Sequence, residues 1–146
     1  MSLAPTLSEA PVDSKQQTAL PKVLCIDDDP EISRIIQLRL SEFEVEVERA
    51  FCGMQGHWLA VTSNPDVIIT DLRMPQGEGE YILECLKRNA ETFHIPVIVL
   101  TGKSGNDLSG QLKSLGAAGF LRKPFHFDEL FNELSQYIKL RSRDFD

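Results

Sequence analysis

Three consecutive carboxylates, Asp27, Asp28 and Asp29, follow the apolar run VLCI and precede a stretch with helical features. A buried carboxylate without a partner is strongly destabilising, and neighbouring like charges oppose one another's ionisation. Packing alone therefore does not explain three acids at the end of a buried strand. Mg²⁺, or Mn²⁺ as an alternative, prefers oxygen ligands and would neutralise them. The run of acids thus indicates a metal site.

Three further polar residues each follow another apolar run. Asp71 comes after DVIIT, Thr101 after PVIVL, and Lys123 after GFLR. Each alone has an ordinary structural explanation, such as opening a turn or facing solvent. Together, a carboxylate, a hydroxyl and an ammonium beside a divalent cation suit a phosphoryl group. A carboxylate can attack phosphorus to give an acyl phosphate, and the other two groups can bind the transferred oxygens.

The elements that must position these residues alternate regularly along the chain. The expected strands cover residues 22–26, 45–48, 66–70, 96–100 and 119–121. The expected helices cover residues 30–42, 53–62, 80–89, 105–115 and 127–140. Strands that alternate with helices are typical of an α/β fold with a parallel sheet.

The strand sequences predict the order of this sheet. The first, third and fourth strands are continuously apolar, as expected when helices cover both faces, whereas VEVE alternates and GFLRK soon becomes polar. We therefore expect a doubly wound, five-stranded parallel sheet in the flavodoxin-like order 2-1-3-4-5, with helices on both faces. Such sheets bind ligands beyond the carboxyl ends of the strands, at the point where the strand order switches.

Two helices carry specific expectations about packing. In the helix 30–42, Asp29 can cap the first turn and Pro30 suits the first helical position. The apolar residues expected on one face of this helix are Ile32, Ile35, Ile36 and Leu40. On the helix 53–62, Trp58 is expected to be a packing residue.

Size and composition limit the class of protein. A chain of 146 residues predicts one domain over residues 21–141, a flexible N-terminal arm or leader over 1–20 and a C-terminal tail over 142–146. A net charge of −7 argues against direct nucleic-acid binding. The absence of a long apolar run or secretory signal, with three widely spaced cysteines, predicts a cytoplasmic protein with reduced thiols and no membrane span.

These features resemble the receiver domain of two-component response regulators, including the chemotaxis-type receivers. The resemblance covers residues 22–140. It is carried by VLCIDDDP, DVIITDLRMP, Gly79 four residues after Pro75, VIVLTG and LGAAGFLRKPF. Any one of these motifs alone would be a weak signal, but their order and spacing agree.

The resemblance implies a role for each polar residue of the site. Asp71 would accept the phosphoryl group, and Asp28 and Asp71 would bind Mg²⁺ directly together with the backbone carbonyl of Arg73. Asp27 would act largely through water. Lys123 would pair with the phosphoryl group and the carboxylates.

The resemblance also implies a conformational switch. Thr101 would bind a phosphoryl oxygen, and Phe120 would fill the space that Thr101 vacates. The Lys123–Pro124 peptide bond is expected to be cis, a state that is accessible mainly before proline. The surface made by the helix 105–115, the strand 119–121 and the helix 127–140 would change, and a phosphorylation-dependent dimer is one output left open.

The expected partner is a sensor histidine kinase or a histidine phosphotransfer protein, and the downstream target is not specified. The domain would not be an enzyme in the usual sense, because it would catalyse only its own phosphorylation and dephosphorylation.

Two other functions remain as alternatives. A haloacid-dehalogenase-like phosphatase also uses two acids spaced like Asp27 and Asp29, but it expects threonine or valine where this chain has Glu31. A degenerate receiver would act as a protein-interaction module without phosphorylation. The segment TGKSG resembles the end of a P-loop, but Val97 replaces the glycine which that motif requires.

Overall fold

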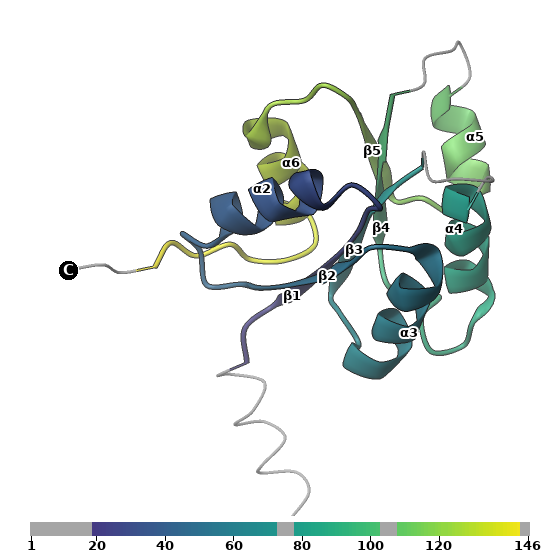
Figure 1. Ribbon diagram of the computed structural model, residues 1–146, viewed down its shortest axis with the longest axis horizontal. Coiled ribbons are helices and arrows are strands. Elements are labelled where there is room, and N and C mark those ends of the chain that lie inside the picture. The colour runs from purple at the N-terminus through teal and green to yellow at the C-terminus, as the bar shows by residue number, and fades with distance from the viewer. Residues whose placement is uncertain (1–18, 73–77, 103–107, 144–146) are drawn as a thin grey trace, which may run out of the picture.

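Five parallel strands form a single sheet in the order β2-β1-β3-β4-β5 (Figure 1), which confirms the predicted order. The computed structural model describes residues 19–72, 78–102 and 108–143. The strands are β1 (Lys22–Ile26), β2 (Glu46–Ala50), β3 (Val67–Asp71), β4 (Val97–Thr101) and β5 (Gly119–Arg122). All residues of β3 and β4 are buried, whereas β2 and β5 are partly exposed edge strands.

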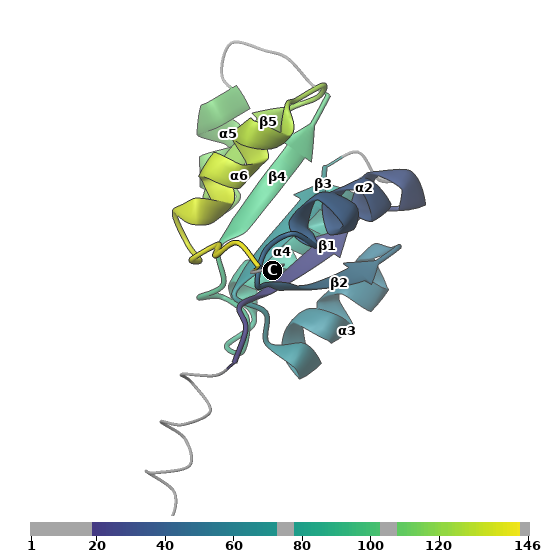
Figure 2. The same cartoon turned by 90° about the vertical axis from the view of Figure 1, so that its left-hand side faces the viewer.

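Helices cover both faces of the sheet, as predicted (Figures 1 and 2). The helices are α2 (Pro30–Leu40), α3 (Gly53–Ser63), α4 (Glu78–Arg88), α5 (Leu108–Ser114) and α6 (Phe127–Ser135). Helices α2 and α6 pack on one face, and α3, α4 and α5 pack on the other. Within the part of the chain that the structure describes, no helix is both long enough and apolar enough to cross a lipid bilayer.

Alternation along β1 supplies both cores. Val23 and Cys25 pack with residues of α2 and α6, whereas Leu24 and Ile26 pack with residues of α3, α4 and α5. Successive side chains of a strand point to opposite faces, so a strand that is apolar at every position can bury both. The sheet is therefore fixed between two apolar layers, which hold the carboxyl ends of its strands in place.

Two packing predictions are wrong. Ile35 is 50% exposed, because α2 turns Ser33, Ile36 and Leu40 toward the sheet instead. Trp58 is 62% exposed, because α3 approaches the sheet through small residues. A Cβ atom on Gly56 would lie 2.5 Å from Cδ1 of Ile26, so this close approach needs glycine.

Several element boundaries also differ from the prediction. The second strand is Glu46–Ala50 rather than 45–48, and α5 is described from Leu108, so that its predicted start at 105 lies outside the described residues. Helix α6 ends at Ser135 rather than 140, although Tyr137 and Ile138 still pack on the α2–α6 core. Apolar residues beyond the helix end extended the periodic pattern without extending the helix.

The segment after α6 runs back to the turn between α2 and β2. Ser142 forms an isolated antiparallel bridge with Phe43, and the Arg143 amide donates to the Glu42 carbonyl at 2.9 Å. The Glu44 amide donates to the Arg141 carbonyl at 2.7 Å. The first residues of the predicted C-terminal tail therefore pack on the domain, and residues 144–146 lie outside the described residues.

Candidate functional site

The carboxyl ends of four strands bring the predicted site residues to one edge of the sheet. Asp27 and Asp28 follow β1, Asp71 ends β3, and Thr101 ends β4. Lys123 follows β5, and its amide donates to the Thr101 carbonyl at 2.8 Å. These residues are separated by up to 96 positions in the chain numbering, from 27 to 123, and the parallel sheet alone makes them neighbours.

Three carboxylates form an acidic cluster: Asp27, Asp28 and Asp71. Each offers one oxygen, and these oxygens all lie within 4.8 Å of one another. Asp27 and Asp71 are 1% and 5% exposed, whereas Asp28 is exposed. Three oxygen donors at this separation, one of them open to solvent, fit a hard divalent cation that retains water ligands.

One oxygen of Asp27 is buried without a partner. Its Oδ1 accepts a hydrogen bond from the Asp29 amide at 2.9 Å, but its Oδ2 has no hydrogen-bond partner among the described residues. Burial raises the pKa of Asp27 to about 6, and the charges of Asp71 and Asp28 add to this shift. The Asp29 hydrogen bond and the Lys123 charge oppose it. A bound cation would satisfy the unpaired oxygen and favour the ionised form.

The Lys123 ammonium places a positive charge beside the acidic cluster. Its Nζ lies 3.1 Å from Oδ2 of Asp71, and the pair is mostly shielded from solvent, since the two side chains are 28% and 6% exposed. The Lys123–Pro124 peptide bond is cis, as the resemblance implied. An ammonium beside a nearly buried carboxylate reduces the repulsion within the acidic cluster, and it would stand close to any group attached to Asp71.

Comparison with known proteins identifies the family of the chain. A model of the response regulator receiver domain matches residues 23–135, which is well over half of the chain. The chain belongs to the response regulator receiver domain family. The resemblance to receiver domains is therefore confirmed. The fold agrees with that of solved receivers, including the Vibrio cholerae chemotaxis protein CheY4. That structure has a TM-score of 0.75 and 29% sequence identity, over 82% of this chain and 100% of that chain.

Curated relatives place receiver domains within longer proteins. The receiver is 33% identical over 124 residues to the DNA-binding dual master transcriptional regulator RpaA of Synechocystis, covering 85% of this chain and 52% of RpaA. It is 34% identical over 110 residues to hybrid signal transduction histidine kinase D of Dictyostelium discoideum, covering 75% of this chain and 7% of the kinase. The chain therefore spans about half, or much less, of the length of these relatives.

The two residues expected to form the switch lie on the neighbouring strands β4 and β5. Thr101 is 1% exposed at the end of β4. Phe120 pairs with Val99 in the register of β4 and β5, and its ring packs, partly buried, against the core on the α3–α5 face.

The remaining residue expected to bind Mg²⁺ follows β3 in the sequence. Arg73, whose carbonyl was expected to bind Mg²⁺, lies outside the described residues. The described chain resumes at α4, where a Cβ atom on Gly79 would lie 2.4 Å from the carbonyl oxygen of Leu72 and 2.8 Å from that of Asp71. Only glycine permits α4 to begin this close to the strand that carries Asp71.

The loop that carries the acids is organised by its own hydrogen bonds. Oδ1 of Asp29 accepts from the Glu31 amide at 3.0 Å, which confirms Asp29 as the cap of α2. A further contact, from Arg49 to the first turn of α2, was not anticipated. An arginine in an edge strand predicts only a solvent-facing charge, so no sequence signal indicated this role.

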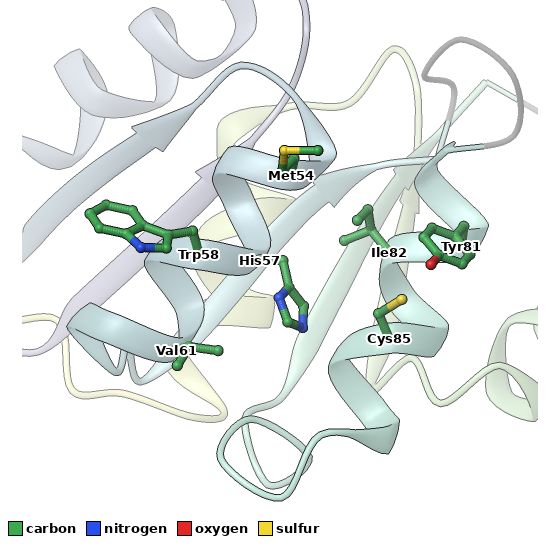
Figure 3. A pocket seen from close by; sticks show the side chains of 7 residues that line it. All are labelled: Met54, His57, Trp58, Val61, Tyr81, Ile82 and Cys85. Carbon is green, nitrogen blue, oxygen red and sulfur yellow. The ribbon is translucent and has the colours of Figure 1, made fainter.

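Two apolar grooves lie outside the acidic cluster. One, of about 560 Å³, lies between α3 and α4 and is lined by residues including Met54, Trp58 and Tyr81 (Figure 3). The other, of about 520 Å³, lies between α2 and α6 and includes Ile35 and Lys123 in its lining. Lys123 lines the second groove and pairs with Asp71, so this groove adjoins the acidic cluster.

Proposed function

We propose that this receiver accepts a phosphoryl group onto Asp71 from a phosphohistidine of a sensor histidine kinase or a histidine phosphotransfer protein. The observation that carries the proposal is the pairing of the Asp71 carboxylate with Lys123 at 3.1 Å, beside the unpaired buried oxygen of Asp27. A carboxylate, a cation and a set of metal-binding oxygens are the groups that phosphoryl transfer to an aspartate needs.

Each residue of the site would have a separate role in binding the metal or the phosphoryl group. Asp28 and Asp71, with the carbonyl of Arg73, would hold Mg²⁺, and Asp27 would act through a water molecule. When bound, the ion would neutralise charge on the transferring phosphoryl oxygens. Lys123, whose Nζ lies 3.1 Å from Oδ2 of Asp71, would contact the same oxygens.

The proposed reaction is a transfer followed by a reset. An oxygen of the Asp71 carboxylate forms a bond to phosphorus while the phosphorus–nitrogen bond of the phosphohistidine breaks, leaving its imidazole as the leaving group. Water then hydrolyses the acyl phosphate, which releases inorganic phosphate and restores the carboxylate. The receiver acts only on itself and would not turn over a separate substrate.

The groove between α2 and α6 is a suitable docking site for the phosphoryl donor. It adjoins Lys123, and its apolar lining includes Ile32, Ile35 and Phe125. The half-exposed Ile35 would contact the donor in this groove. A donor helix placed here would bring its histidine to the acidic cluster.

We also propose that the receiver domain covers residues 21–141 and functions in the cytoplasm without binding nucleic acid directly. The family match over residues 23–135 and the net charge of −7 support this assignment. A target, or a dimer that forms on phosphorylation, would read the surface of α5, β5 and α6.

The acceptor can be tested by intact mass. Incubation with Mg²⁺ and a small acyl phosphate is expected to add one phosphoryl group to the wild type. The addition should vanish in Asp71→Asn and when EDTA removes the metal. As a control, Asp128→Asn changes an exposed acid in the first turn of α6 and should still be phosphorylated. A wild type that gains no mass and also fails to bind beryllofluoride would instead favour the non-phosphorylated interaction module.

The coupling between site and surface can be tested at Thr101. Thr101→Ala is expected to leave Asp71 able to accept the phosphoryl group, because it removes no carboxylate. It should blunt the response of Phe120, because the hydroxyl that moves toward the phosphoryl group is gone. Nuclear magnetic resonance of a labelled Phe120 ring, with and without beryllofluoride, measures the response. An undiminished shift of Phe120 in the variant would contradict this coupling.

A further inference from the structure

Arg49, near the end of β2, clamps the first turn of α2. Its Nε donates to Oγ of Ser33 at 2.9 Å, and its Nη2 donates to the carbonyl of Pro30 at 3.0 Å. Ser33 is completely buried, so this hydroxyl is held in a fixed position. The guanidinium also lies over the ring of Phe51, with Cζ 5.1 Å from the ring centroid. The arginine is thus restrained by three partners from two segments.

The acidic loop is consequently anchored at both ends by neighbouring residues of one strand. At its start, the Asp27 amide donates to the carbonyl of Ala50 at 3.0 Å. At its end, the side chain of Arg49 holds the carbonyl of Pro30. Asp27 and Asp28 lie between these two anchors, and β2 thereby sets the path of the loop relative to β1.

We propose that Arg49 is a positioning residue that holds the acidic loop so that Asp27 and Asp28 present their oxygens beside Asp71. Within the described part of the chain, its contacts are with a hydroxyl, a carbonyl and a ring rather than with a carboxylate. Its effect is therefore transmitted through the loop. Directed bonds from a planar guanidinium fix geometry in a way that a lysine ammonium does not.

The consequence for metal binding follows from the sensitivity of such sites to placement. A binding site loses function when its ligands are displaced by more than about 0.5 Å, and outer residues supply that precision. Release of the first turn of α2 would let Asp28 move away from Asp71. This part of the inference rests on the proposed function, since it concerns the same Mg²⁺ site.

The first test is Mg²⁺ affinity, measured by amide chemical shifts and calorimetry. Arg49→Met keeps the aliphatic stem and removes both hydrogen bonds, and we expect about tenfold weaker binding, as for other residues that orient metal ligands. Arg49→Lys keeps the charge but not the fork, and a similar loss is expected. Wild-type affinity in Arg49→Lys would overturn the positional role in favour of charge alone.

The control removes an arginine charge from α2, the helix that Arg49 contacts. Arg34 lies in α2, its side chain is 57% exposed, and its ion pair with Glu31 is long, at 3.8 Å. Arg34→Met should therefore bind Mg²⁺ as the wild type does. An equal loss in this control would also overturn the inference.

A second variant tests the route of the effect. If Arg49 acts through Ser33, then Ser33→Ala should weaken Mg²⁺ binding, and the double variant should lose no more than Arg49→Met alone. Additive losses would show independent effects and contradict the proposed route. The mild Ser33→Ala change keeps the inference testable even if Arg49→Met does not fold.

Hydrogen exchange in the metal-free protein tests the role of Arg49 independently of the proposed function. In the metal-free protein, the amides of residues 28, 29 and 31–33 should exchange hydrogen about tenfold faster in Arg49→Met than in the wild type, because local opening becomes easier. Unchanged exchange would overturn the positional role. A wild type that neither binds Mg²⁺ nor gains a phosphoryl group, but shows this exchange difference, would instead sink the proposed function alone.

Discussion

Asp27→Asn is expected to stabilise the metal-free receiver at pH 7 by at most about 3 kcal/mol. Folding raises the pKa of Asp27 from 3.8 to about 6, chiefly through burial, and each pKa unit corresponds to about 1.4 kcal/mol. The unpaired buried Oδ2 is the structural origin of this penalty. Asparagine keeps an oxygen that can accept from the Asp29 amide and removes the charge. Urea unfolding of both proteins in EDTA measures the difference.

The same pKa shift predicts how stability depends on pH. The folded protein binds the Asp27 proton more tightly than the unfolded chain does, so the native state is favoured at low pH. This contribution is complete below about pH 4, is lost as the pH rises to about 6 and does not change above that. Asp27→Asn should lack this dependence. Asp128→Asn, at an exposed position, should retain it.

Mg²⁺ should make the wild type more stable than Asp27→Asn, the reverse of the order without metal. A ligand that binds only the folded state adds stability according to its concentration and its dissociation constant. The wild type should therefore gain stability from Mg²⁺, while Asp27→Asn should gain much less, because its metal site lacks a carboxylate. A variant that is less stable than the wild type without metal would contradict the penalty. Equal gains from Mg²⁺ would contradict the assignment of Asp27 to the metal site.

Gly79→Ala is expected to lower the free energy of unfolding by about 2 kcal/mol, in the range found for overpacked sites. The added Cβ would lie 2.4 Å from the carbonyl oxygen of Leu72, and that backbone atom cannot rotate away. Either α4 or the end of β3 must shift. Since Asp71 precedes Leu72, Mg²⁺ binding should weaken as well.

Gly119→Ala provides a control with the same nominal overlap. Its Cβ would also lie 2.4 Å from an oxygen, but this is Oε1 of Glu133, the far end of a flexible side chain. Its stability should stay within about 0.5 kcal/mol of the wild type, as for most tolerated surface changes. Thermal and urea unfolding of the two variants and the wild type measure these differences in stability. Equal losses would mean that the Leu72 carbonyl is not the determining contact.

The sequence predicts the sheet and the site better than the side-chain packing of its helices. Continuous apolar runs identify β3 and β4 as central strands, and parallel strands end on one edge, so Asp71 and Lys123 could be placed together. By contrast, α2 turns the polar Ser33 inward and Ile35 outward. The inward position of Ser33 depends on its hydrogen bond with Arg49, which comes from strand β2.

The boundary errors have a related physical origin. Tyr137 and Ile138 continue the apolar pattern of α6, but they pack on the core after the helix has ended. Burial drives apolar residues toward a core whether or not they are helical. Periodicity therefore reports which residues are buried more reliably than it reports where a helix stops.

Trp58 has a practical consequence for spectroscopy, because it is the single tryptophan of the chain. It is largely exposed on α3, beside the groove shared with α4 (Figure 3). Mg²⁺ would instead bind beyond the ends of β1 and β3. The intrinsic fluorescence of Trp58 will follow the solvent around that outer helix. The emission should therefore change little when Mg²⁺ binds to the acidic cluster. It should become more intense or shift to the blue when another molecule covers α3.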